Sequence, residues 1–190
     1  MTNTKTAPEK IEARTEVRSF NLSILTENKS GLLNAVTIIF TRRKINIESI
    51  NVSETEVEGV SRYTIVIETT REQAEKVVKR IRKLIDVFWA FVYENDEIYY
   101  QELALYKVPT KVFLNGDNAE HLVRNNGARI LVIEEDFIII EKTGHQRETR
   151  DLLEKLKPYG VMEFVRSGRI AMSKSTRRTD LFLQELHNHH

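Results

Sequence analysis

The sequence predicts an α+β protein made of two similar units, each with the order strand, helix, strand, strand, helix, strand. Three observations support this fold class. Alternating and helically spaced hydrophobic residues follow each other in this order over residues 17–93. A shorter copy of the same order follows over residues 102–165. The length of 190 residues is sufficient for two small domains.

The first unit begins with a strand and a helix that a polar turn separates. Phe20, Leu22 and Ile24 alternate with more polar neighbours between Val17 and Thr26, which is typical of a half-buried strand. After the turn, apolar residues recur at the spacing of one helical face: Leu32, Leu33, Val36, Ile39 and Phe40. We therefore expect a helix of about three turns that ends near Arg42.

A hairpin, a second helix and a last strand complete the first unit. Residues 45–53 are rich in β-branched side chains, alternation returns in 61–68, and an acidic turn at Glu58-Gly59 joins the two stretches. Thr70-Arg71-Glu72-Gln73 has the pattern of a capping box. The apolar residues of the helix behind it are Ala74, Val77, Val78, Ile81, Leu84 and Ile85. With a strand at 87–93, this is the order of a ferredoxin-like domain, whose helices cover one face of an antiparallel sheet.

The second unit repeats this order in shorter form. Its expected strands are 102–108, 129–133, 137–141 and 161–165, and its expected helices are 117–125 and one carrying Leu152, Leu153 and Leu156. The stretch between Val108 and Ala128 is short, so we expect a reduced helix there. The expected domains are a flexible leader at 1–16, a first domain at 17–96, a second at 97–173 and a polar tail at 174–190.

The composition excludes several classes of protein. The chain has no cysteine, which excludes disulfides, thiolate metal sites and a cysteine nucleophile. Lys and Arg number 29 against 28 Asp and Glu, so the charge imbalance expected of a dedicated nucleic-acid binder is missing. No stretch approaches the ~20 apolar residues of a membrane span, and the N-terminus has no signal-peptide core. We expect a cytoplasmic protein without a membrane partner.

The sequence contains none of the common catalytic motifs. GxSxG, HExxH, Walker A and dinucleotide GxGxxG patterns are all missing. Glu134-Glu135-Asp136 joins two apolar stretches, which favours a solvated hairpin turn over a metal site. Three of the five histidines crowd the last four residues and receive no role. We therefore expect no catalytic residue and no metal ligand.

Basic segments are the remaining argument for nucleic acid. Arg42-Arg43-Lys44 ends one expected helix, and residues 79–83 occupy the outer face of the other. An RNA-binding sheet of this topology needs aromatic side chains on its open face, where Tyr63 and Trp89 are candidates. Charges at helix ends and on outer faces ordinarily serve solvation, so RNA binding is the weaker alternative.

The turn between the first strand and helix is the strongest local candidate for a binding site. It consists of Asn28, Lys29, Ser30, Gly31, Leu32 and Leu33. Free backbone N–H groups at a helix start attract an anion such as a carboxylate, and a glycine allows a ligand to approach the main chain. Local chemistry leaves a simpler alternative open, in which Ser30 or Asn28 caps the helix.

Two stretches carry a resemblance to a known family. Residues 25–33 read LTENKSGLL, and residues 40–50 read FTRRKINIESI. They resemble the motifs L-x-E-N-x-x-G-x-L and F-x-x-R-G-x-N-I-E-S-L of the ACT domain in the small regulatory subunit of acetolactate synthase. The Asn-Ile-Glu-Ser element separates this family from other ACT domains. Lys44 stands where the family usually has glycine.

The resemblance continues through the second unit and spans about Phe20 to Ser173. Residues 83–87 resemble the family's K-L-x-D-V, residues 102–108 its E-L-x-L-x-K-V, and residues 163–168 its E-x-x-R-[ST]-G. The resemblance thus implies a small subunit with an N-terminal ACT domain and a shorter, ACT-like C-terminal domain.

The resemblance also implies where an effector binds. In this family, the ACT domains of two copies form a homodimer with one continuous sheet, and a branched-chain amino acid, usually valine, binds at their interface. Its carboxylate would meet the N–H groups around Ser30, Gly31 and Leu32. Asn46 of the partner subunit would accept from its ammonium group, and Leu33 and Ile47 would form the apolar wall. The expected effector-binding residues are Asn28, Lys29, Ser30, Gly31, Leu32, Leu33, Asn46 and Ile47.

The resemblance implies a non-catalytic role in an enzyme complex. The chain would bind the large catalytic subunit of acetolactate synthase, raise its activity and withdraw that activation when the effector binds. Thiamine diphosphate, magnesium and FAD are expected on the catalytic subunit and no cofactor on this chain. A free-standing ACT amino-acid sensor that acts on a different enzyme is the alternative.

Overall fold

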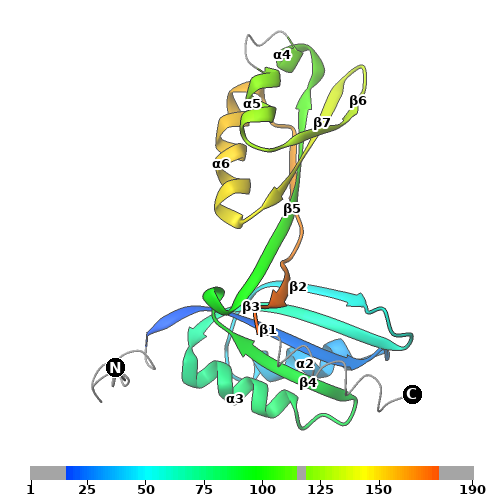
Figure 1. Cartoon of the computed structure of the whole chain (residues 1–190), viewed down its shortest axis with the longest axis vertical. Helices are drawn as coiled ribbons and strands as arrows, with labels where there is room; N and C mark the ends of the chain where they lie inside the picture. Colours follow the sequence, from blue (N-terminus) through cyan, green and yellow to red (C-terminus); the bar gives the residue numbers. More distant parts are fainter. Residues whose placement is uncertain (1–15, 115–118, 176–190) are drawn as a thin grey trace. The chain divides into compact units, whose positions relative to one another are not determined.

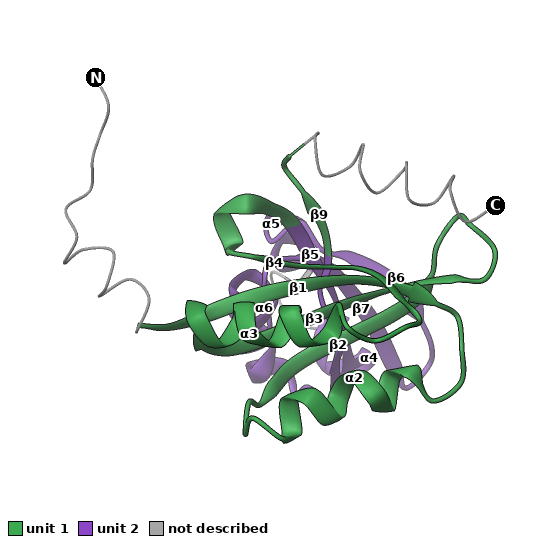
Figure 2. Cartoon of the chain, turned by 90° about the horizontal axis from the view of Figure 1, so that it is seen from below, with its two compact units in different colours: residues 1–99, 171–190 green, residues 100–170 purple. Residues whose placement is uncertain are grey.

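The computed structural model describes residues 16–114 and 119–175. The chain forms two compact units, residues 1–99 with 171–190 and residues 100–170 (Figure 2). The first unit has the order strand, helix, strand, strand, helix, strand around one antiparallel sheet, as the sequence predicts. The second unit follows the same order with one additional short helix after its first strand. The fold is therefore α+β with two ferredoxin-like units.

The first unit is built on a four-stranded sheet with the order β2-β3-β1-β4 (Figure 1). Its elements are β1 (Val17–Glu27), α2 (Leu32–Thr41), β2 (Ile47–Glu54), β3 (Val60–Thr70), α3 (Arg71–Ile81) and β4 (Val87–Tyr93). β1 pairs with β3 over its whole length, from Val17 opposite Thr70 to Glu27 opposite Val60. From Asn21 onward it also pairs with β4. β2 lies at the end of this strand order.

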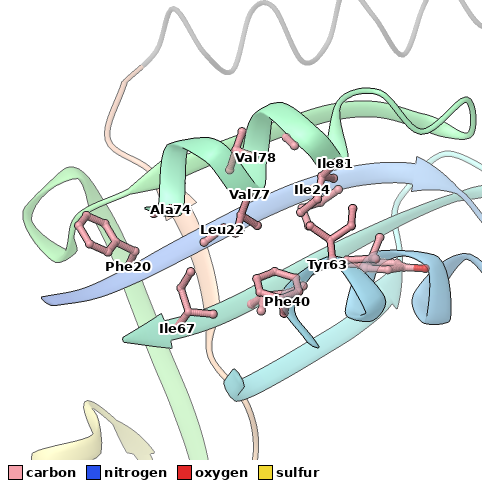
Figure 3. Packing of buried hydrophobic residues seen from close by; sticks show 14 of the residues in the cluster. Phe20, Leu22, Ile24, Phe40, Tyr63, Ile67, Ala74, Val77, Val78 and Ile81 are labelled. Carbon is pink, nitrogen blue, oxygen red and sulfur yellow. The ribbon is translucent and has the colours of Figure 1, made fainter. Parts of the chain in front are cut away.

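The core of the first unit lies between the sheet and its two helices (Figure 3). Alternation along β1 turns Phe20, Leu22 and Ile24 toward the helices, and each is at most 1% exposed. The helices contribute Val36, Ile39, Phe40, Ala74, Val77, Val78 and Ile81. Burial of side chains of this size stabilises the fold by ~1.5 to 3 kcal/mol each. The predicted apolar faces thus form the core.

The end of α3 differs from the prediction. The expected helical spacing included Leu84 and Ile85, but α3 ends at Ile81 and Ile85 is 97% exposed. Arg82, the residue after the helix, donates from Nε to the carbonyl oxygen of Ala90 in β4 at 2.7 Å. This bond ties the helix end to the sheet, and the chain turns there.

The second unit has the strand order β6-β7-β5-β8, and β9 also pairs with β5. Its elements are β5 (Ile98–Pro109), α4 (Thr110–Leu114), α5 (Ala119–Asn125), β6 (Arg129–Ile133), β7 (Phe137–Gly144), α6 (Gln146–Leu156), η2 (Lys157–Tyr159) and β8 (Glu163–Arg166). The short 3₁₀ helix η1 (Asn95–Glu97) and residues 171–173 of β9 (Ile170–Ser173) belong to the first unit. The expected reduced helix is present as α5, with the unpredicted α4 before it. The start of the predicted helix, at Asp117, lies outside the described residues.

Tyr106 lies at the centre of the second core. Its ring is fully buried, and its hydroxyl donates to the carbonyl oxygen of Thr149 at 2.6 Å. Burial raises the pKa of this hydroxyl, which therefore keeps its proton at neutral pH. Around it pack Val108, Phe113, Ile138, Ile140, Leu152 and Leu156.

Within the described ranges, no helix is long and apolar enough to cross a membrane.

Lys44 generates a prediction about stability. Among the described residues it is the one non-glycine residue with a positive φ, at 56°. Lys44→Gly should raise the free energy of unfolding by about 1 kcal/mol, because a β-carbon is disfavoured in the left-handed region. Urea unfolding followed by circular dichroism measures the change. Arg43→Gly, at a neighbouring turn residue without positive φ, is the control and should lower stability. If both variants lost the same free energy of unfolding, Lys44 would not be strained in the left-handed region.

The two helices of the first unit generate a second prediction, because they begin differently. The Thr70 hydroxyl accepts from the Gln73 N–H at 3.3 Å, whereas no described side chain caps α2. Thr70→Ala should therefore lower the free energy of unfolding by about 1 kcal/mol, and Ser30→Ala should change it by less than about 0.5 kcal/mol. Thermal unfolding compares the two variants. A Ser30→Ala variant as unstable as Thr70→Ala would show that Ser30 caps α2.

Candidate functional site

The predicted turn is held in place by backbone hydrogen bonds on both sides. The Glu27 N–H donates to the carbonyl oxygen of Asp86 at 2.9 Å, and the Asn28 N–H donates to that of Gly59 at 2.7 Å. Gly59 belongs to the β2–β3 turn, and Asp86 immediately precedes β4. The end of β1 is thus fixed between two other loops before the chain enters α2.

The side chains of Asn28 and Lys29 bind acidic partners. Asn28 Nδ2 donates to Oε1 of Glu54, the last residue of β2. Lys29 Nζ donates to Oδ1 of Asp86 at 3.0 Å, and this hydrogen bond raises the pKa of the lysine. Lys29 is therefore a charged ammonium group beside the turn at neutral pH. Neither side chain caps α2, so the predicted cap by Asn28 is wrong.

Gly31 takes the N-cap position of α2 with left-handed backbone angles, φ 85° and ψ −14°. No side chain caps the helix there, so the predicted alternative of a Ser30 cap is also wrong. A β-carbon built on Gly31 would meet no atom within 4 Å, which shows open space above the turn. The glycine gives the backbone its conformation and leaves the helix start accessible.

The first turn of α2 offers unused backbone donors. The Ala35 N–H donates to Gly31 at 3.0 Å, and the Leu32 N–H makes a long 3.4 Å bond to Lys29. In the part of the chain that the structure describes, nothing accepts from the N–H groups of Leu33 and Asn34. Together with the positive end of the helix dipole, these donors suit a carboxylate.

The other predicted half of the site lies at the opposite end of α2. Asn46 follows the helix, is exposed and donates from Nδ2 to Oε1 of Glu48 at 3.1 Å. Ile47 begins β2 and lies opposite Ile67 of β3. Ten helical residues span ~15 Å, so a single copy does not bring Asn46 and Ile47 to Gly31.

Exposed apolar side chains occur on both α2 and β2. Leu33 and Ile38 of α2 are 42% and 38% exposed, and Val52 of β2 is 41% exposed. The sequence pattern placed Leu33 on the buried face of the helix, but in the first turn it stays accessible beside the candidate anion site. Among the described residues β2 is also the last strand of its sheet, so its outer edge offers backbone groups without a strand partner beside the exposed Val52.

The aromatic residues considered for RNA binding lie on opposite faces of the sheet. Tyr63 is 4% exposed and belongs to the core beneath the helices, so the prediction that it lies on the open face is wrong. Trp89 alternates with the core residue Ala90 and lies on the other face. In the described residues, no three His, Asp or Glu side chains gather as metal ligands.

Two family models match the chain. One describes an AHAS small subunit-like ACT domain and matches residues 22–88. The other describes the small subunit of acetolactate synthase and matches residues 101–175. The first match contains the Gly31 turn, Asn46 and the whole of β2.

Curated relatives match over most of their length. The acetolactate synthase small subunit of Bacillus subtilis is 36% identical over 162 residues, which cover 83% of this chain and 91% of the relative. The probable acetolactate synthase small subunit of Archaeoglobus fulgidus is 33% identical over 157 residues, covering 83% and 98%.

A solved structure matches most of the chain. The crystal structure of the acetolactate synthase small subunit from Thermotoga maritima has a TM-score of 0.76 and 28% identity. The match covers 84% of this chain and 99% of that one. Since fold and sequence agree over nearly the whole described chain, the protein belongs to the family of acetolactate synthase small subunits.

Proposed function

We propose that this chain is the regulatory subunit of a cytoplasmic acetolactate synthase. It is not itself a catalyst; it binds the large catalytic subunit, which carries thiamine diphosphate, magnesium and FAD, and raises the activity of that subunit. A branched-chain amino acid, with valine expected, withdraws the activation when it binds between two copies of the chain. The uncapped start of α2 at Gly31, in a chain of this family, is the observation that carries the proposal.

The helix start supplies the site for the effector's carboxylate. In the described chain the N–H groups of Leu33 and Asn34 have no acceptor, and a β-carbon on Gly31 would meet no atom within 4 Å. The ammonium group of Lys29, paired with Asp86, lies at the same turn. Backbone N–H groups recognise the carboxylate that all amino acids share. The side chain of the effector must therefore be selected by other residues, for which Leu33 and Ile47 are the candidates.

A second copy can complete the site through the edge strand β2. If the β2 strands of two copies pair antiparallel about a twofold axis, the start of one β2 lies beside the end of the other. The end of β2, at Glu54, is where Asn28 binds. This pairing therefore brings Asn46 and Ile47 of the partner subunit toward the Gly31 turn, which a single copy does not do.

The apolar wall sets the expected selectivity among effectors. Contacts with one methylene group more or less separate ligands by roughly tenfold to two-hundredfold. We therefore expect valine, leucine and isoleucine to differ in affinity within this range.

Gly31→Asp tests the position of the carboxylate site. The substitution adds a side chain and a negative charge at the open helix start, so it should abolish inhibition by valine and leave activation intact. The measurement is conversion of pyruvate to acetolactate by the large subunit, titrated with this chain, with and without L-valine. Gly160→Asp, at a second glycine with positive φ in the other unit, is the matched control. It should remain sensitive to valine.

The outcomes of this titration separate the alternatives. A Gly31→Asp complex as sensitive to valine as the parent would place the site elsewhere. If the folded chain binds valine but leaves acetolactate synthesis unchanged, the free-standing sensor becomes the better assignment.

Mixed dimers test whether two copies form each site. Gly31→Asp and Asn46→Ala homodimers should each bind valine weakly or not at all. A dimer with one copy of each variant keeps one intact site, made from the turn of the Asn46→Ala copy and Asn46 of the other. Isothermal titration calorimetry of the purified mixed dimer should therefore show half as many valine-binding sites per dimer as the parent dimer has. If one copy alone formed the site, the mixed dimer would regain no site.

A further inference from the structure

The sheet of the first unit carries a pocket on the face opposite its helices. Its volume is about 260 Å³. Ser23 and Leu25 of β1 and Thr64 of β3 line it, together with an aromatic row along β4. The row consists of Trp89, Phe91 and Tyr93, with successive ring centroids 4.2 Å and 6.0 Å apart. An apolar, aromatic surface with a few polar groups is typical of a binding site.

The C-terminal strand forms another wall of this pocket. Ala171, Met172 and Ser173 of β9 line it, and Met172 is 71% exposed. The Lys174 N–H donates to the carbonyl oxygen of Glu97 at 3.0 Å, and its ammonium group lies 4.9 Å from the centre of the Tyr99 ring. These contacts hold the chain in place just before the described residues end at Ser175, two residues beyond the pocket wall.

The sequence that follows complements the pocket. Within residues 176–190 the apolar side chains are Leu181, Phe182, Leu183 and Leu186. The six steps along the chain from Ser175 to Leu181 reach at most ~22 Å, and four strands of a sheet are ~15 Å across from first to last. The apolar cluster is therefore within reach of the pocket wherever on this face it binds.

Charge and covalent attachment both favour the chain's own C-terminal segment as the ligand of this pocket. Arg177-Arg178 and Asp180 precede the apolar cluster, and the pocket lining includes Glu56 and Arg62. A segment attached to the pocket wall by a short link has an effective concentration in the millimolar range. It therefore competes well against free ligands and other proteins.

We propose that residues 181–186 of the chain's own C-terminal segment bind in this pocket, with Phe182 and Leu183 against Trp89 and Phe91. The pocket is thus an intramolecular docking site, and release of the segment uncovers the half-buried rings of Trp89 and Phe91. This assignment does not depend on the proposed function, because the pocket lies on the sheet face opposite α2.

Tryptophan fluorescence tests the proposal directly, because Trp89 is the one tryptophan of the chain. The full chain is compared with a chain that ends at Ser175, after circular dichroism has shown that both are folded. Truncation should shift the emission to longer wavelength and increase quenching by acrylamide. Addition of a peptide of residues 176–190 to the truncated chain should reverse both changes.

Two single substitutions in the full chain provide a matched pair. Leu183→Asp should reproduce the emission of the truncated chain, whereas Gln184→Asp adds the same charge at a polar position and should leave the emission unchanged. Identical emission from the full and truncated chains would overturn the proposal. A shift in the full chain that depends on protein concentration would also overturn it, because a second copy would then occupy the pocket.

Discussion

The pairing of β1 on both of its edges is the constraint on which the rest of the first unit depends. Its register with β3 runs from Val17 opposite Thr70 to Glu27 opposite Val60, and β4 pairs with the other edge. A slip of one residue would turn Phe20 and its alternating neighbours away from the helices, so the core enforces this register. The register in turn fixes where β1 ends and where α2 begins.

The candidate site that results consists mainly of backbone groups. Gly31 in a left-handed conformation starts α2 without a side-chain cap, and a β-carbon there would meet no atom within 4 Å. Asn28 and Lys29 bind Glu54 and Asp86, so they brace the turn and leave the helix start free. Backbone donors fit any amino-acid carboxylate, which is why the proposed site draws its selectivity from Leu33 and from a second copy.

A ligand that touches two copies links effector binding to assembly. Such a ligand shifts the arrangement of the copies only by the difference in its affinity for each arrangement. Coupling of this kind is typically worth ~1 to 3 kcal/mol and acts in both directions, so the proposed regulation requires that a bound large subunit also change the affinity for the effector. The candidate effector site and the aromatic pocket use different faces of one sheet, which allows the two to be tested separately.

The sequence by itself determined the order of the elements and the position of the Gly31 turn, because hydrophobic periodicity, caps and glycine turns are local signals. β4 was predicted with its observed bounds, and both matched motifs lie where the turn and β2 are found. Only the tertiary structure decided that α3 ends at Ile81, that Asn28 binds Glu54 and that Tyr63 faces the core. These outcomes depend on partners far away in the sequence, such as Ala90 for Arg82, and no local pattern encodes which distant groups will meet.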